Sequence, residues 1–335
     1  MVTASITRRR AVLGTVGAGA LSLARVSMAQ IGTAFPVKPI RLVIPFPPAG
    51  ATDILGRAIG QKLGEVLGQQ VVIDNKPGAG GAIGSDAVAK ATPDGYTILL
   101  ATTSTHCIGP ILSSKIPYQV ERDFTPLAYA ANATNVLLVP KETPANTLEE
   151  FITYARARPG QLNYGTSGQG TISHLTSEYF ARAAGLRLVH IPYKGTALVI
   201  PDLIAGQINL IFDSFVSALP HIKSGKVKAL GVSSVTRSPL TPEIPTMQEA
   251  ARGALPGFES GTRFGFYGPA GLPAAIVALL NAQINKTLAM PEVRERLATV
   301  GAEPVGGTPE ALTRAMQQDR EKWSRVVREA GVRVE

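Results

Sequence analysis

The chain has 335 residues, of which 45% are hydrophobic and 17% are charged, with a formal net charge of +9 and a single cysteine, Cys107. This composition excludes a disordered chain, and the length suffices for two domains of ordinary size. One cysteine excludes a disulfide framework and a thiolate metal site. The basic residues form no block interleaved with aromatic residues, so a nucleic-acid partner is not predicted, and the positive excess suits an anionic ligand better.

The first 29 residues have the three parts of an export signal. Three arginines at 8–10 precede a short apolar stretch over 11–24, and a small-x-small cleavage site follows at 27–29. The stretch is too short to span a bilayer as a helix. The paired arginines favour twin-arginine export, with an ordinary Sec signal as the alternative. We expect a periplasmic protein, cleaved near Ala29, that loses the four signal arginines and keeps a net charge of about +5.

After the signal, short β-branched runs alternate with helical patterns. In the first part, strands are predicted over 40–45, 71–74 and 96–101, and helices over 54–67 and 83–90. Because helices of this length separate the strands, we expect parallel pairing through right-handed crossovers, and therefore an α/β sheet.

The same alternation continues with new material. Further strands are predicted over 136–139, 162–164, 187–191, 208–212, 228–233 and 263–267. Further helices are predicted over 148–158, 172–184, 201–205, 274–289, 291–300 and 309–330. We expect the C-terminal helices to pack back on the first sheet. This gives one lobe over 30–126 plus 250–335 and a second lobe over 127–249, with crossings near 124–130 and 245–265.

Two loops of small residues lie between a predicted strand and a predicted helix, one at 46–53 and one at 165–171. Ligands of α/β sheets bind at such junctions, because helix N-termini present backbone N–H groups there. Small residues let the backbone approach a ligand, and Thr52, Ser167 and Thr171 add hydroxyl donors. Several N–H donors can hold a carboxylate without an arginine. Simple helix capping is the alternative for each loop, but the occurrence of one in each half favours a shared site.

Other kinds of site fit the sequence less well. Gly78, Gly80 and Gly84 are one residue off the dinucleotide-binding spacing. Ser167 lacks the second glycine of a nucleophile elbow, and we expect His174 to fix the loop and not to act as a base. The four histidines lack the spacing of zinc ligands. We therefore predict no catalytic residue, no metal and no cofactor.

Asp213 ends the apolar run over 208–212. A lone carboxylate at a strand end could accept a hydrogen bond from a ligand amine or hydroxyl. The alternative is that Asp213 caps the helix that follows, through Ser217. The sequence leaves both interpretations open.

Taken together, the motifs resemble the Bug-type solute receptors of tripartite tricarboxylate transporters. The resemblance covers nearly the whole chain after the signal. It rests on PFPPAGATD (45–53), DNKPGAGG (74–81), PDGYT (93–97), GxGTxxHL (168–175), PYKG (192–195), GKVKAL (225–230) and IPT (244–246). It implies a type II periplasmic binding protein, with two α/β lobes around an interdomain ligand cleft and ordered waters that bridge one ligand carboxylate to the loops.

The resemblance also implies which residues bind the ligand. They would come from the first loop, from the end of the third strand and from the second lobe: Phe46, Pro48, Ala49, Gly50, Ala51, Thr52, Ser104, Thr105, Ser167, Gly168 and Thr171, with Tyr193 and Asp213 nearby.

Two positions depart from the family pattern. Ala49 is found where the family usually has glycine, and Arg263 where a tryptophan is common. A guanidinium is a planar fork suited to a carboxylate. One hypothesis is therefore that the ligand is a dicarboxylate, aromatic or not, whose distal acid is held by Arg263. The alternative is a surface or interdomain arginine that never contacts ligand.

These observations predict a monomeric receptor, not an enzyme, that captures a small organic carboxylate for the membrane permease subunits of a tripartite transporter. A ligand-presenting sensor component of a two-component system would use the same pocket. A periplasmic hydrolase would need a general base that the sequence does not offer. The sequence leaves open which acid is bound.

Overall fold

The computed structural model describes residues 35–330, so the predicted export signal lies outside the described residues. From Pro36 onward the chain forms one unit. Its strands are β1 (Ile40–Ile44), β2 (Val71–Asn75), β3 (Thr97–Thr102), β4 (Phe124–Pro140), β5 (Asn163–Thr166), β6 (Val189–Pro192), β7 (Ile211–Ser214), β8 (Val227–Val232), β9 (Gly261–Pro269) and β10 (Ala302–Pro304).

The helices are of two kinds. The longer ones are α1 (Ala51–Leu67), α2 (Ala82–Ala89), α5 (Leu148–Arg156), α6 (Ile172–Ala183), α7 (Thr196–Ile204), α8 (Phe215–Lys223), α10 (Ala274–Ala289), α11 (Pro291–Thr299) and α12 (Pro309–Ala330). The short ones are η1 (Ala79–Gly81), the π-helical turn η2 (Ser104–Ile108), α3 (Gly109–Leu112), α4 (Val120–Asp123) and α9 (Met247–Ala250). No helix in the described part of the chain is long and apolar enough to cross a membrane.

Most of the described strands join one mixed sheet, in the order β10-β4-β9-β3-β1-β2, with β7 and β8 also paired to β4. Strand β1 is parallel to β2 and β3, as expected for strands joined by helical crossovers. Strand β9 is antiparallel to both β3 and β4. Strands β5 and β6 form a separate parallel pair. The α/β class predicted from the sequence is confirmed, but the main sheet is mixed and not purely parallel.

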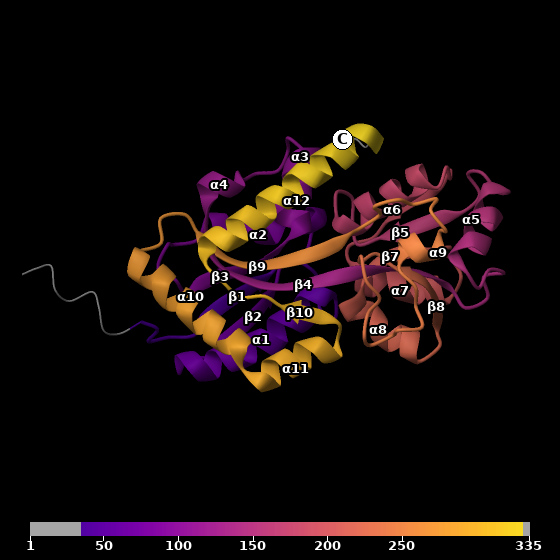
Figure 1. Ribbon diagram of the computed structural model, residues 1–335. Helices are drawn as coiled ribbons and strands as arrows, with labels where there is room; N and C mark the ends of the chain where they lie inside the picture. Colours follow the sequence, from indigo (N-terminus) through magenta and orange to yellow (C-terminus); the bar gives the residue numbers. More distant parts are fainter. Residues whose placement is uncertain (1–34, 331–335) are drawn as a thin grey trace, which may run out of the picture. The chain divides into compact units, whose positions relative to one another are not determined.

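The 17-residue strand β4 connects the two groups of strands, as Figure 1 shows. Its first part, up to Thr134, pairs with β9, and the part from Asn135 onward pairs with β7 and then with β8. The sequence predicts a strand only over 136–139 of β4. The first part of β4 forms its hydrogen bonds with β9, which lies more than a hundred residues further along the sequence. Pairing of this kind is invisible to local periodicity.

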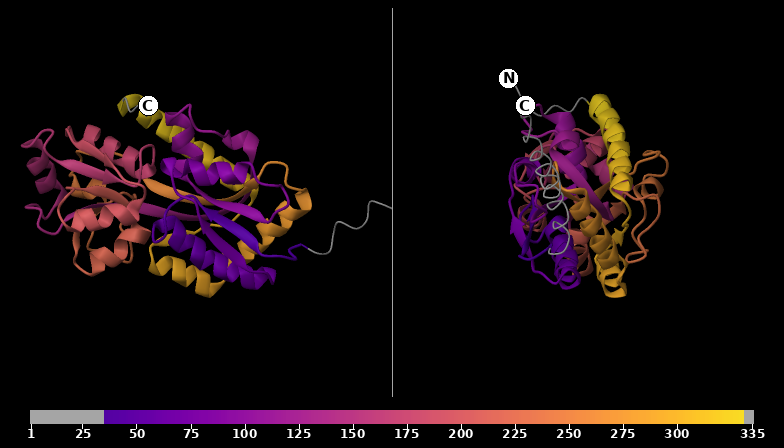
Figure 2. Two further views of the ribbon diagram at one scale, coloured as in Figure 1. Left: turned by 180° about the vertical axis from the view of Figure 1, so that it is seen from behind. Right: turned by 90° about the vertical axis from the view of Figure 1, so that its left-hand side faces the viewer.

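The sheet near β1 and β3 is buried on both faces (Figures 1 and 2). Val43 and Leu99 pack with α2 and α12 on one face. The alternate residues Ile44 and Leu100 approach α1 on the other, where a Cβ on Gly56 would lie 2.6 Å from Ile44. Strands covered on both faces read as continuous apolar runs, which the sequence has here. The predicted return of the C-terminal helices to the first sheet is confirmed.

The second half of β4 is also covered on both faces. Leu137 and Val139 belong to a core with α5, α6 and β7, whereas Val136 and Leu138 belong to a core with α7 and α8. This alternation is the two-residue period of a strand. Helix α12 packs on the first sheet and also contacts α6, through the buried side chain of Trp323.

Candidate functional site

A small cavity of about 50 Å³ lies where the N-termini of α1, α6, α7 and α8 converge. The first residues of α1, α6 and α7, which are Ala51, Ile172 and Thr196, line it together with Ser214, the N-cap residue of α8. No N-cap side chain satisfies the N-terminal N–H groups of these four helices, although the Ile172 N–H of α6 donates to the Ser104 hydroxyl at 3.0 Å. Each N-terminus carries a partial positive charge from the helix dipole, so the position suits an anion. Below, this space is called the deep cavity.

The deep cavity is polar but offers no cationic side chain. None of the described residues that line it is a lysine, an arginine or a histidine. Among the described residues, the buried hydroxyls of Thr102 and Ser214 lack a hydrogen-bond partner, and both residues line the cavity. Buried polar groups in proteins are nearly always paired, so unpaired hydroxyls at a cavity indicate a place for a ligand or ordered water.

A second cavity, of about 530 Å³, adjoins the deep one and is called the outer cavity. Both cavities share Phe46, Ser104 and Ser167 as lining residues. The outer cavity adds the glycine loop 78–81, apolar side chains from α2 and α3, and the side chain of Lys115. A ligand with one carboxylate in the deep cavity would therefore place the rest of its body in the outer cavity.

The first loop is held in place by residues around the start of α1. The carboxylate of Asp53 accepts hydrogen bonds from the Ala49 backbone N–H at 3.0 Å, from Arg57 and from Asn75. Asn75 also donates to the Phe46 carbonyl at 3.0 Å. Burial alone would raise the pKa of Asp53, but the hydrogen bond from Arg57 and those from Ala49 and Asn75 lower it. Asn75 was not among the site residues predicted from the sequence, although it belongs to the DNKPGAGG motif.

Ala49 adopts a φ of 65°, which is the left-handed region that favours glycine. The resemblance implies glycine at this position, and the backbone of this chain keeps a glycine-like turn. The side chain of Ala49 is exposed and lines neither cavity. The departure therefore strains the turn without narrowing the site.

The second loop is held by two stacked histidines. The Gly170 backbone N–H donates to His174 Nδ1 at 3.3 Å, and His190 Nε2 lies 2.7 Å from the Thr166 hydroxyl. The two imidazole rings stack with centroids 4.1 Å apart. Burial lowers the pKa of His174 to about 3 and that of His190 to about 4, so both are neutral acceptors or donors at neutral pH. The prediction that His174 fixes this loop is confirmed.

The loops from the two halves meet through glycines. A Cβ on Gly195 would lie 2.6 Å from the Pro47 ring. A Cβ on Gly80 would lie 2.9 Å from the Gln169 carbonyl oxygen. Real side chains do not tolerate such distances, so the close approach of these loops requires glycine at both positions.

Most of the predicted site residues surround the two cavities. The deep cavity is lined by Phe46, Gly50, Ala51, Thr52, Ser104, Ser167 and Asp213. The outer cavity adds Thr105, Gly168 and Tyr193. Thr171 lines neither, and its hydroxyl donates to the Gly168 carbonyl at 2.7 Å. Pro48 is exposed and lines neither cavity.

Several lining residues were not predicted from the sequence. Pro47 belongs to the first loop, and the others lie outside the two predicted loops: Thr102, Asn135, Ile172, Ser173, Thr196, Phe212, Ser214, Thr262 and Phe264. One sequence feature could have identified three of these residues, namely their position in the elements. Thr102 and Ser214 end strands, and Thr196 begins a helix.

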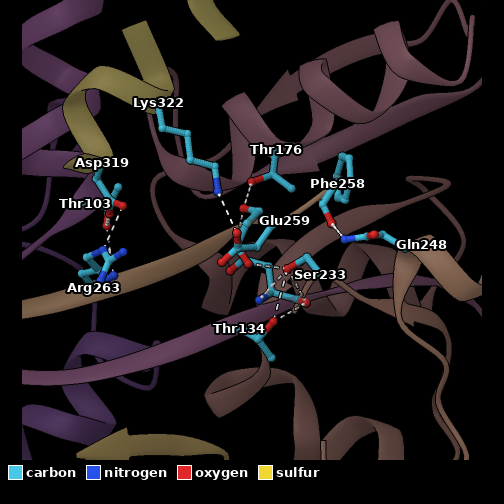
Figure 3. A network of polar contacts seen from close by, with 12 residues as sticks. Thr103, Thr134, Thr176, Ser233, Gln248, Phe258, Glu259, Arg263, Asp319 and Lys322 are labelled. Carbon is cyan, nitrogen blue, oxygen red and sulfur yellow. Dashed lines mark hydrogen bonds and ion pairs between the residues drawn. The ribbon is translucent and has the colours of Figure 1, made fainter. Parts of the chain in front are cut away.

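Arg263 lies on the opposite side of β9 from the deep cavity. Its neighbours Thr262 and Phe264 line that cavity, and because side chains alternate along a strand, Arg263 faces the other way. There its Nε donates to the Asp319 carboxylate at 2.8 Å and its Nη1 to the Tyr129 hydroxyl at 2.6 Å. Figure 3 shows Arg263 beside Asp319, below α12.

The surroundings of Arg263 form a different cavity, of about 790 Å³, which also includes Thr134, Glu259 and Lys322. Lys322 and Glu259 form an ion pair at 3.7 Å (Figure 3). The structure therefore does not bring Arg263 together with the other predicted site residues.

Asp213 has features of both interpretations left open by the sequence. Its carboxylate accepts a hydrogen bond from the Ser217 hydroxyl in α8 at 2.8 Å, and it also lines the deep cavity. The N-cap of α8 is the next residue, Ser214. Among the described residues, no group of three or more His, Cys, Asp or Glu side chains is placed to hold a metal ion.

Known proteins are similar to this chain in both sequence and fold. The family model described as "Tripartite tricarboxylate transporter family receptor" matches residues 55–332. Protein BugT of Bordetella pertussis is 35% identical over 331 residues, which cover 98% of this chain and 99% of BugT.

Two similar solved structures are complexes with a carboxylate. One is Rpa4515 of R. palustris with adipate, at 34% identity and a TM-score of 0.87, covering 89% of this chain and 99% of that chain. The other is MatC from Rhodopseudomonas palustris with bound malate, at 34% identity and a TM-score of 0.83, covering 88% of this chain and 100% of that chain.

Proposed function

Because the chain belongs to the receptor family of tripartite tricarboxylate transporters, we propose that it holds one carboxylate of its ligand in the deep cavity and the rest of the ligand in the outer cavity. The observation that carries this proposal is the convergence of uncapped helix N-termini on a cavity without a cation. Such a site stabilises a carboxylate through N–H donors and helix dipoles. The adipate and malate in the similar structures support this ligand class.

In this proposal the ligand contacts come from both halves of the chain. Gly50, Ala51 and Thr52 act from α1, and Ser167 acts from the second loop. The lobes are 30–126 with 250–335, and 127–249, and the chain crosses between them in β4 and again before β9. The change of partner along β4, from β9 to β7, supports two lobes with a crossing inside this strand, but it favours a crossing after Thr134 and not after Pro126.

The receptor would act by binding and release, as a monomer that delivers its ligand to the permease subunits, without catalysis. Among the described residues that line the deep cavity, Asp213 is the one ionisable side chain, which supports a binding role. Catalysis by general acid and base would need a partner group beside it.

The site is tested by changing one hydroxyl on each side of it. Thr52→Val and Ser167→Val should each weaken adipate or malate binding by about 1–3 kcal/mol, because each removes a hydrogen-bond partner of a charged group. Titration calorimetry measures the loss, and a thermal-shift assay on the native protein first checks that either acid raises the melting temperature. Thr299→Val, on the exposed side of α11, is the control and should bind like the native protein. Unchanged affinity in both site variants would reject this placement of the ligand.

We also propose export to the periplasm with cleavage near Ala29. The arginines at 8–10 motivate it. Changing Arg8 and Arg9 to lysine should leave uncleaved precursor in the cytoplasm, which cell fractionation detects. Normal secretion and cleavage of that variant would instead indicate the Sec route.

A further inference from the structure

Asp213 is the ionisable group nearest to the proposed carboxylate position. It lies in β7, is only 3% exposed, and lines the deep cavity. Its carboxylate accepts hydrogen bonds from the Ser217 hydroxyl at 2.8 Å, from the Ser214 backbone and from Thr196. A ligand carboxylate in a cavity of about 50 Å³ must therefore lie close to the carboxyl group of Asp213.

Two ionised carboxylates in this space would repel each other strongly. No lysine, arginine or histidine among the described lining residues could stand between them. In a buried site with low effective dielectric, like charges at short range favour protonation of one of the two groups. The N-termini of α1, α6, α7 and α8 can stabilise one negative charge through their dipoles, but they do not remove the repulsion of a second.

The charged groups on the neighbouring elements do not offset the charge of Asp213. Asp53 of α1 pairs with Arg57. Asp202 of α7 accepts from the Tyr193 hydroxyl, and His221 of α8 lies beyond the lining of the deep cavity. From β4, the nearest polar side chain is the neutral amide of Asn135, which donates to Ser260 at 2.8 Å.

The protonation equilibrium of the free protein agrees with this environment. Burial raises the pKa of Asp213 to about 6, although hydrogen bonds from Ser217, from the Ser214 backbone and from Thr196 lower it. No charged residue is among the causes of the shift. Asp213 is thus mostly ionised at pH 7 in the free protein and can gain a proton at small cost.

We propose that the receptor takes up one proton with each ligand molecule, so that Asp213 is the neutral acid in the complex and its O–H donates to the ligand carboxylate in the deep cavity. The proton comes from solvent and returns to it on release, and no covalent bond to the ligand forms. This inference rests on the proposed function, because it assumes that the deep cavity holds a carboxylate. Asp213 then selects a ligand that binds as an anion together with one proton.

The test is the pH dependence of adipate binding. Adipate has no hydroxyl or amine that could donate to Asp213, and it stays doubly ionised between pH 6.5 and 8.5. Over this range, at constant ionic strength, the dissociation constant of the native protein should rise about 50- to 100-fold, since loss of one bound proton costs up to tenfold per pH unit above the free-state pKa. Calorimetry at pH 8.5 in buffers of different ionisation enthalpy should report uptake of about one proton.

Asp213→Asn supplies the matched variant, because an amide keeps the size of the neutral acid and its ability to donate but does not titrate. It should bind adipate at pH 8.5 about as tightly as the native protein does at pH 6.5, with little pH dependence. Asp94→Asn, an exposed acid outside both cavities, should keep the native pH dependence.

The failures of this inference and of the proposed function are distinguishable. Adipate binding that is independent of pH, or that takes up no proton, overturns the inference and leaves the receptor function intact. A folded Asp213→Asn protein that loses binding at every pH also overturns it, because Asp213 would then act as an anionic acceptor. If neither adipate nor malate binds the native protein at any pH, the proposed carboxylate site itself fails.

Discussion

Replacing Gly195 with alanine should lower the free energy of unfolding by about 2–4 kcal/mol and weaken carboxylate binding at least tenfold, for two separate reasons. Gly195 has φ 138° and ψ 158°, a region that is open essentially to glycine alone. Forcing another residue into it costs about 1–3 kcal/mol. In addition, the new Cβ would lie 2.6 Å from the Pro47 ring, where the first loop meets the start of α7.

The second reason is what links this position to ligand binding. Pro47 lines the deep cavity, and Gly195 directly precedes Thr196, which lines it too. An alanine at 195 would push the two loops apart and with them the groups that surround the carboxylate. Chemical denaturation measures the stability, and titration calorimetry with adipate measures the binding.

Two further variants separate the backbone strain from the clash. Gly206→Ala, just beyond the other end of α7, also has a positive φ, 73°, but its Cβ would meet nothing within 4 Å. It should lose stability and keep native affinity. Adding Pro47→Ala to Gly195→Ala should recover part of the binding, as a double-mutant cycle would quantify. Equal losses of affinity in Gly195→Ala and Gly206→Ala would refute the role of the Pro47 contact.

Removal of the Asp319 carboxylate should destabilise the protein by about 3 kcal/mol while leaving ligand affinity unchanged, because it strands the partly buried guanidinium of Arg263. The Arg263 and Asp319 side chains are 31% and 9% exposed, and their ion pair closes at 2.8 Å. Asp319 also accepts a hydrogen bond from Thr103 at 3.0 Å, directly before η2 (Figure 3). Both partners therefore connect α12 to the sheet.

Denaturation of Asp319→Ala, Arg263→Ala and the double variant measures this pair. The double variant should be more stable than the sum of the two single losses indicates, because no unpaired charge remains. Lys322→Ala, which removes a longer and more exposed ion pair with Glu259, should cost less than about 1 kcal/mol.

The same variants decide between the two interpretations of Arg263. If Arg263 only supports the fold, Arg263→Ala should bind adipate and its monocarboxylate analogue hexanoate with the same relative affinity as the native protein. A selective loss for adipate would mean that the guanidinium reaches the ligand, and would return Arg263 to the site.

Much of the local structure could be predicted from the sequence. Helix α12 begins and ends at the predicted residues 309 and 330, and α10 at the predicted 274 and 289. The spacing of apolar residues that predicts each of these helices, and the residues that mark its ends, lie within one short segment of the sequence. The same holds for the loops at 46–53 and 165–171, whose small residues mark strand-to-helix junctions wherever the chain folds. The sequence by itself therefore determined many of the elements, the α/β class and two of the loops around the candidate site, but not α8, β10 or the first part of β4.

The tertiary structure alone decided which side chains meet. Thr102, Thr196 and Ser214 join Thr52 around one cavity because β3 and β7 end, and α7 begins, at the same place, and no local pattern contains that convergence. Arg263 faces away from the cavity because β9 pairs with β4 in a register that turns Thr262 and Phe264 toward it. The side-chain period of a strand is two, so a shift of one residue would have reversed these faces. Only the long-range pairing of strands decides which alternate residues of β9 face the cavity, and therefore which residues a ligand can contact.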